Sequence, residues 1–166
     1  MGISERKARE KEQMKSAILA AAMRLFVEEG IEKVSIRKIA AAIEYSPATI
    51  YLYFKDKDEI LYELHRIAFL EFRAAFTKSA VIAEPFERLR FIGRSYIDFA
   101  MNNTPQYDLM FIMRSPLDHV EKEEEEAWEA GKGSFFILVE TVAACLQAGL
   151  IRPGDPRGIA YSLWGY

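Results

Sequence analysis

The sequence predicts an all-α protein, and three observations lead to this fold class. Apolar residues recur with the 3.6-residue period of an amphipathic helix along almost the whole chain. No segment shows the alternation and hairpin turns that are typical of β-strands. Capping residues, prolines and glycines divide the chain into successive helices. With 166 residues, 51% of them hydrophobic, the chain is long enough for one domain or two small ones.

The N-terminal region contains two predicted helices that end and begin at clear signals. The first runs from Ser4 to Glu29 and stops at Gly30, because a glycine there adopts a positive φ without steric cost. Ser35 caps the second helix, Ile36 to Ile43, because its hydroxyl accepts a hydrogen bond from a free backbone N–H group.

Two more helix starts follow directly. The pair Ser46-Pro47 combines a capping serine with a proline at the first helical position, and it predicts a third helix that runs to Phe54. Acidic residues at positions 56 and 59 then form a pair that resembles a capping box. This pair opens a long helix over residues 57–81.

The second half of the chain is predicted to be a further set of helices. Gly131 and Gly133 predict a break between two of them, and Asp155-Pro156 predicts the start of the last one. That helix stops at Tyr166 without a cap, so we expect either a chain that continues or an apolar end that another surface covers. The predicted helices span residues 85–101, 106–113, 119–130, 134–148 and 156–166.

Composition excludes several classes of protein. No stretch reaches the ~18 consecutive apolar residues that span a bilayer, so we expect no membrane segment. Residues 1–15 are rich in charge, unlike a secretory leader, which predicts a cytoplasmic protein. The single cysteine, Cys145, lies in an apolar stretch and is interpreted as a core residue. The net charge of −3 does not by itself suggest a nucleic-acid partner.

The two short helices joined by a tight turn predict a helix-turn-helix, whose second helix enters the major groove of DNA. Residues 34–40 (VSIRKIA) and 45–61 (YSPATIYLYFKDKDEIL) resemble the DNA-binding domain of TetR-family (tetracycline-repressor-like) transcriptional regulators. The resemblance implies a helix-turn-helix DNA-binding domain over residues 1–56. It also implies a C-terminal helical domain over residues 57–166 that binds a small ligand and forms a homodimer, joined to the first by a long helix.

The third helix has two different sides. Ile50 and Phe54 lie four residues apart and anchor the helix inward. The outward side carries Leu52, for which thymine methyl groups are a suitable partner and packing on the protein body is the alternative. The small or apolar groups that share this role are those of Pro47, Ala48 and Thr49.

Polar and basic residues around this helix are suited to the DNA backbone. The hydroxyls of Tyr51 and Tyr53 match phosphate oxygens, and the alternative is a pair of half-buried core tyrosines. Ser35 and Lys57 stand at helix N-termini, which favour phosphate. Arg37 is the best candidate for a bidentate contact with guanine, against the alternative of a surface ion pair. The predicted DNA-binding residues are Ser35, Arg37, Ser46, Pro47, Ala48, Thr49, Tyr51, Leu52, Tyr53 and Lys57.

One residue departs from the family pattern. Where the family usually has glycine in the turn between the two short helices, this chain has Glu44. A non-glycine residue there is expected to adopt a strained backbone at a cost on the order of 1 kcal/mol, and it places an acid near DNA.

The C-terminal half is rich in Phe, Tyr, Trp and Met, a composition suited to an apolar ligand pocket or to an ordinary core. The predicted ligand-binding residues are Phe72, Tyr96, Met110 and Trp128. The ligand is expected to be small and largely apolar. No metal or cofactor site is predicted, because neither histidine has a ligand-spaced partner.

The leading hypothesis is a homodimeric repressor that a small ligand releases from a palindromic operator in double-stranded DNA. An enzyme is disfavoured, because the sequence has no nucleophile–base pair, phosphate loop or paired carboxylates and so no predicted catalytic residue. The alternative is a DNA-binding scaffold protein of the nucleoid or of cell division, with no response to a ligand.

Overall fold

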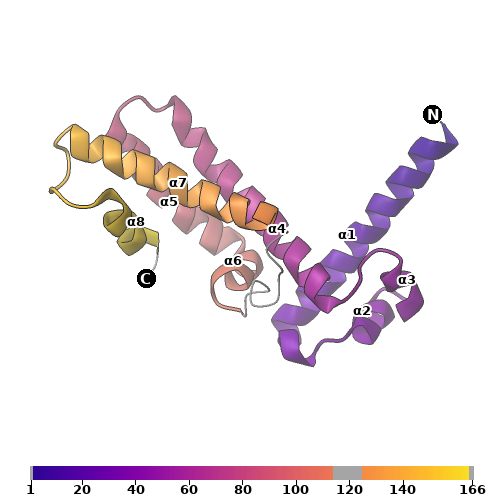
Figure 1. Ribbon diagram of the computed structural model, residues 1–166. Helices are drawn as coiled ribbons and strands as arrows, with labels where there is room; N and C mark the ends of the chain where they lie inside the picture. The colour runs from indigo at the N-terminus through magenta and orange to yellow at the C-terminus, as the bar shows by residue number, and fades with distance from the viewer. Residues whose placement is uncertain (1, 114–124, 165–166) are drawn as a thin grey trace. The chain divides into compact units, whose positions relative to one another are not determined.

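The computed structural model describes residues 2–113 and 125–164, and no strand occurs in these ranges (Figure 1). The predicted all-α fold is confirmed. By its contacts the described chain forms two compact units, residues 2–64 with Met113, and residues 65–112 with residues 125–164. The boundary lies between Leu64 and His65, inside one continuous helix.

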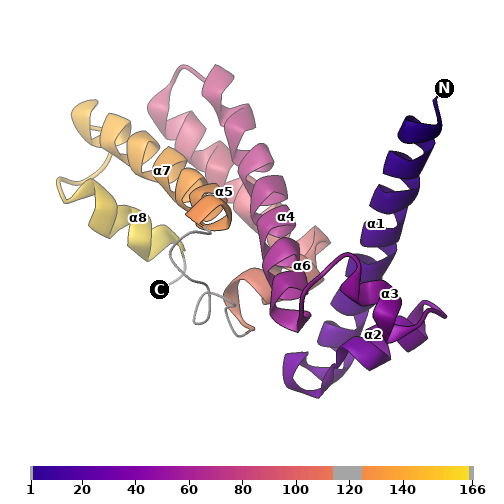
Figure 2. The same ribbon diagram turned by 45° about the vertical axis from the view of Figure 1, so that its right-hand side comes forward.

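The first unit contains three helices and the start of a fourth. These are α1 (Ile3–Glu29), α2 (Ile36–Ala42), α3 (Pro47–Tyr51) and the first two turns of α4 (Lys57–Thr77), with a 3₁₀ turn, η1 (Ile31–Lys33), after α1. α2 packs against both α1 and α3 (Figure 2). The core of the first unit is formed by the fully buried residues Ile18, Ala22, Phe26, Ile39, Ala40, Ile50 and Ile60.

The predicted caps are present and explain where the helices begin. The Ser35 hydroxyl accepts from the backbone N–H of Lys38 at 3.3 Å, which caps α2. The Ser46 hydroxyl accepts from the backbone N–H of Thr49 at 3.3 Å, which caps α3. At the start of α4, Asp56 Oδ1 accepts from the N–H of Glu59 at 2.9 Å. These local hydrogen bonds are encoded within three residues of each start, so sequence alone could locate them.

Some helix ends differ from the expectation. α3 ends at Tyr51 and not at Phe54, because Tyr53 and Phe54 both donate to the carbonyl of Ile50 and close a turn. α4 ends at Thr77, and a 3₁₀ turn, η2 (Lys78–Val81), takes up the rest of the predicted helix.

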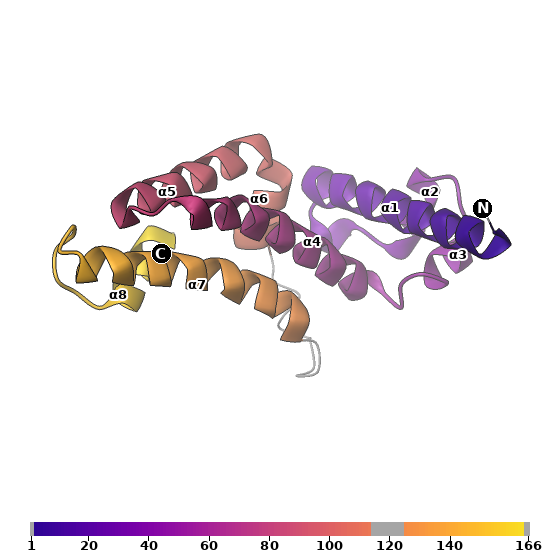
Figure 3. The ribbon, with the colours of Figure 1, turned by 90° about the horizontal axis from the view of Figure 1, so that it is seen from above.

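The second unit is a layered set of helices. α5 (Pro85–Asn102), α6 (Thr104–Phe111), α7 (Glu125–Gln147) and α8 (Pro156–Trp164) accompany the remainder of α4. α7 packs against α5 and α8, and α5 packs against α6 (Figure 3). Phe72 of α4 is fully buried at the centre, with edge-to-face contacts to Tyr96, Phe99 and Trp164 at ring-centroid distances of 5.5, 5.0 and 5.6 Å. Cys145 of α7 is fully buried, as predicted.

The predicted break at Gly131 and Gly133 is wrong. α7 continues through both glycines, although each glycine weakens a helix by about 1 kcal/mol relative to alanine. A Cβ atom at position 133 would lie 2.9 Å from Cζ of Arg73, so glycine allows the guanidinium of α4 to lie against the backbone of α7. The helix predicted over residues 119–130 lies partly outside the described residues.

Candidate DNA-binding surface and apolar groove

α3 presents one side outward and holds the other in the core. Ile50 is fully buried and Phe54 is 4% exposed, whereas Tyr51 is 57% exposed and Leu52 is 77% exposed. The side chain of Leu52 therefore does not pack on the described part of the protein body. Ser46 and Ala48 are exposed, and Pro47, Thr49 and Tyr53 are partly exposed. The Ser46 and Thr49 hydroxyls lie 3.1 Å apart, so the Thr49 hydroxyl has a hydrogen-bond partner in the residue that caps α3.

The turn between α2 and α3 has a defined hydrogen-bond pattern. Glu44 donates from its N–H to the carbonyl of Ala41 at 3.2 Å, and Tyr45 donates to the carbonyl of Ala40 at 3.0 Å. This pair of bonds is the Schellman motif, which requires a left-handed residue at its turn. Glu44 fills that position with φ of +61°, so the expected strain is present and the turn keeps the geometry that glycine would give it.

The exposed residues in the first turn of α2 are basic, Arg37 and Lys38. Arg37 is exposed, and within the described chain no carboxylate forms an ion pair with it. The neighbouring Lys38 forms an ion pair with Glu29 and so joins α2 to the last turn of α1. Ser35 is exposed at the N-terminus of α2. Arg37 is therefore available to a base or a phosphate, while Lys38 has a structural partner.

Lys57 has a structural role that sequence reasoning missed. Its Nζ donates to the backbone carbonyl of Ile31 at 2.8 Å, and its side chain is half-buried. The bond joins η1 to the first turn of α4. Two of the three N–H donors of the ammonium group remain for a phosphate.

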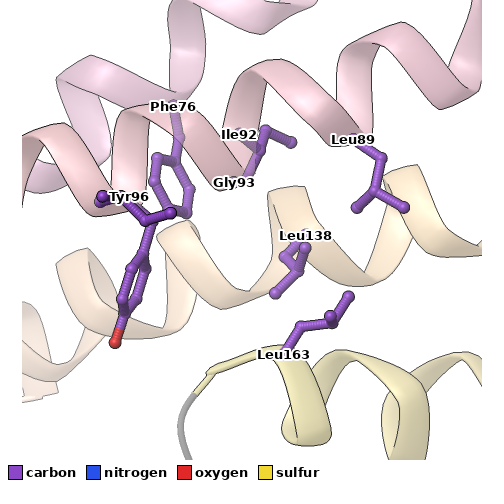
Figure 4. Close-up of a pocket in the computed structure, with 8 residues that line it drawn as sticks. Phe76, Leu89, Ile92, Gly93, Tyr96, Leu138 and Leu163 are labelled. Atoms are coloured by element: carbon purple, nitrogen blue, oxygen red, sulfur yellow. The ribbon is translucent and has the colours of Figure 1, made fainter.

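The second unit contains an apolar groove of about 350 Å³ (Figure 4). α5 contributes most of its wall, and single residues of α4, α7 and α8 complete it. No lining residue is charged, and the groove is open at a rim where Ile97 and Leu163 are 57% and 53% exposed. Its lining residues are Phe76, Leu89, Ile92, Gly93, Tyr96, Ile97, Leu138 and Leu163.

Tyr96 forms one end of the groove and connects three helices. Its ring lies on the groove wall, while its hydroxyl, at the far end of the ring in Figure 4, lies 3.1 Å from the Tyr107 hydroxyl of α6. The same hydroxyl donates to the backbone carbonyl of Trp164 in α8, also at 3.1 Å. Burial and the hydrogen bond with Tyr107 raise the pKa of Tyr96, so it stays neutral and keeps its proton for donation.

Of the four predicted ligand-binding residues, Tyr96 lies on the groove wall. Phe72 and Met110 are buried in the adjoining core and do not line the groove, and the side chain of Trp128 lies outside the described residues. Sequence reasoning missed Gly93, although a single glycine inside a strongly periodic helix was a detectable signal.

His65 is a buried residue outside both sites. It is 6% exposed, its ring contacts Phe69, and within the described residues its Nε2 has no hydrogen-bond partner. Burial lowers the pKa of His65 to about 4, so the ring is neutral at physiological pH.

Taken together, a short outward-facing α3, a tight turn and an exposed arginine on α2 define a helix-turn-helix of the DNA-binding kind. A family model described as bacterial regulatory proteins, tetR family, matches residues 18–64. A second, described as tetracyclin repressor-like, C-terminal domain, matches residues 89–166. The chain belongs to the TetR family, whose members are DNA-binding transcriptional regulators.

Individual proteins agree with this assignment. An uncharacterized HTH-type transcriptional regulator of Haemophilus influenzae is 33% identical over 94 residues, which are 56% of this chain and 50% of that protein. The match thus spans about half the length of this curated relative. The structure of the TetR-family regulator PfmR from Thermus thermophilus is similar with a TM-score of 0.77 and 26% identity, covering 87% of this chain and 79% of that one.

A further similar structure contains ligands. AibR, in complex with isovaleryl coenzyme A and operator DNA, matches with a TM-score of 0.77 and 28% identity. The match covers 91% of this chain and 82% of AibR. In this chain, none of the described helices is both long and apolar enough to cross a membrane.

Proposed function

We propose that this chain is a cytoplasmic, homodimeric repressor that binds a palindromic operator through α3 and is released by a small ligand with an apolar part. The observation that supports DNA binding is the exposure of α3. Leu52 is 77% exposed, and Ile50, two residues before it, is fully buried. Ile50 therefore anchors the helix in the core, while the apolar side chain of Leu52 faces outward. Thymine methyl groups in the major groove remove such a side chain from water.

The surrounding residues supply the backbone contacts in this proposal. Tyr51 and Tyr53 donate hydroxyls to phosphate oxygens on either side of Leu52, and Ser35 and Lys57 contact phosphates at the starts of α2 and α4. Arg37 contacts guanine or phosphate. A two-fold dimer places two copies of α3 about 34 Å apart, one duplex turn, which requires a palindromic site.

The apolar groove supports the ligand half of the proposal. Its volume of about 350 Å³ lies within the range of small-molecule sites, and its side chains are hydrocarbon apart from the Tyr96 hydroxyl. AibR, at 28% identity, binds isovaleryl coenzyme A. We infer that the groove accepts the acyl group of a coenzyme A thioester, whose polar part remains outside the apolar wall.

The groove has a direct structural connection to the DNA-binding unit through α4. Phe76, on the groove wall, and Ile60 and Leu61, in the core of the first unit, belong to the same continuous helix. An occupant that shifts Phe76 therefore acts on the helix whose first turns belong to the DNA-binding unit. Release follows if the ligand-bound state of the dimer has a lower affinity for the operator.

Selection of binding sites from random duplexes, followed by fluorescence anisotropy, tests the DNA-binding proposal. Thr49→Ala should change the preferred bases, whereas Tyr51→Phe should weaken binding to all sequences by a similar factor, of about 5-fold, because one hydrogen bond of about 1 kcal/mol is lost. Val81→Ala, at an exposed position of the second unit, is the control and should change neither. Unchanged affinity and preference in both α3 variants would contradict the assignment.

A second measurement separates the repressor from a scaffold protein. A repressor should protect one palindrome with a steep dependence on salt, and an acyl-coenzyme A should weaken that binding. Binding to many dispersed sites with no effect of any acyl-coenzyme A would favour a scaffold protein of the nucleoid.

A further inference from the structure

Gly93 occupies an unusual position in the wall of the apolar groove. It lies in the interior of α5, between the groove residues Ile92 and Tyr96. A Cβ atom built at Gly93 would have no heavy atom within 4 Å, apart from its own helix backbone and chain neighbours. Gly93 is exposed and lines the groove, so a side chain there would enter open space and not packed protein.

Neither the backbone nor the packing of α5 needs a glycine here. The glycines with positive φ in the described chain are Gly30 and Gly149, so Gly93 has an ordinary helical conformation. By contrast, a Cβ at Gly133 would clash with Arg73. A glycine in a helix interior weakens the helix relative to alanine. At position 93 it also leaves open space beside the groove where a side chain would stand.

We propose that Gly93 is the specificity-determining residue of the groove, and that its missing side chain sets the length of the acyl chain that the groove accepts. This inference rests on the proposed function, in which the acyl group of a coenzyme A thioester occupies the groove. The occupant is assigned from the uncharged hydrocarbon lining and the small volume of the groove. A volume of about 350 Å³ corresponds to roughly a dozen water-sized volumes of about 30 Å³ each, which is enough for a short acyl chain.

The size of the expected effect follows from the hydrophobic effect. Each methylene excluded from an apolar site lowers affinity about 4-fold, because burial of one methylene contributes about 0.8 kcal/mol. Gly93→Ala fills the space of about one methyl group and should weaken the longest accepted chain about 4-fold. Gly93→Leu adds four carbon atoms and should shift the preferred chain length down by several carbons.

The experiment uses the full chain and isothermal titration calorimetry with straight-chain acyl-coenzyme A thioesters of two to twelve carbons, with coenzyme A alone as the reference. The variants are Gly93→Ala, Gly93→Leu and the control Asp98→Leu, which places the same side chain at an exposed position of α5 outside the groove. We expect a shorter preferred chain for both Gly93 variants and an unchanged profile for the control. Thermal unfolding should show a higher midpoint for Gly93→Ala, which verifies that the variant is folded.

The outcomes distinguish this inference from the proposed function. If the unaltered protein binds no acyl-coenzyme A, the proposed ligand class is wrong and the inference falls with it. If the unaltered protein binds and the Gly93 variants keep its chain-length profile, the inference alone is overturned. If Gly93→Leu instead abolishes self-association in analytical ultracentrifugation while acyl-coenzyme A binding persists, the groove holds a second copy of the chain and the inference is also overturned.

Discussion

Replacing Glu44 by glycine will stabilise the DNA-binding unit. Glu44 has φ of +61°, a conformation that costs a residue with a Cβ atom roughly 1–2 kcal/mol. Glycine removes this cost but adds about 0.5–1 kcal/mol of backbone entropy in the unfolded chain. The difference leaves a net gain of about 0.5–1 kcal/mol. In a chain of this size, that gain raises the unfolding midpoint by roughly 1–4 °C.

Glu44→Gln separates the backbone effect from the charge of Glu44, and Gly149→Ala tests the backbone effect at a second position. Glu44→Gln keeps the Cβ atom and removes the carboxylate, so its midpoint should stay within about 1 °C of the parent protein. Gly149 closes α7 with the same hydrogen-bond pattern and φ of +67°, and a Cβ atom there would have no non-local heavy atom within 4 Å. Gly149→Ala should therefore be destabilised by about 1 kcal/mol through its backbone alone.

The assay is thermal unfolding followed by circular dichroism, together with anisotropy on a fixed duplex. Both Glu44 variants remove an exposed acid near α3, so both should raise affinity for all duplexes by a similar factor at low salt. Equal midpoints for Glu44→Gly and Glu44→Gln would refute the strain argument. A higher affinity in the glycine variant alone would refute the charge argument.

Three other predictions concern packing and protonation. Burial lowers the pKa of His65 to about 4 in the folded state, against 6.5 in the unfolded state. The free energy of unfolding is therefore highest above pH 6.5 and falls by up to about 3 kcal/mol toward pH 4. His65→Leu should flatten this pH dependence in urea titrations at several pH values. Lys57→Met should lose about 1 kcal/mol even without DNA, since the bond to Ile31 is broken, and an unchanged urea midpoint would contradict that role. Tyr96→Phe should lose about 1–2 kcal/mol, measured by the same titration, because the Trp164 carbonyl loses its donor, and Tyr107→Phe should lose less.

Local features of this fold were predictable because their causes lie within a few residues. Ser35, Ser46 and Asp56 each cap a helix through a backbone N–H three residues ahead, and the positive φ at Glu44 follows from the turn that α2 and α3 require. The continuation of α7 through Gly133 was not predictable. The glycine at this position accommodates the Arg73 side chain, which lies far away in the sequence.

The same distinction between local and non-local causes applies to the candidate sites. The burial of Ile50 and Phe54 and the exposure of Leu52 could be predicted from the helical period, although the helix itself ends at Tyr51 and a turn places Phe54 in the core. The roles of individual residues could not be predicted, because these roles depend on neighbours from other elements. Lys57 binds the carbonyl of Ile31, and the ring of Tyr96 lies on the groove wall while its hydroxyl holds α6 and α8.

The sequence by itself determined the helical class, the helix starts and the outward face of α3, because helical period and capping depend on contacts within one or two turns. Only the tertiary structure decided which aromatic residues form the core and which line the groove. Phe72 and Tyr96 have the same apolar character in sequence, yet one is fully buried and the other borders the open space beside Gly93. That difference arises from how α4, α5, α7 and α8 pack, and non-local packing is not encoded in any short segment.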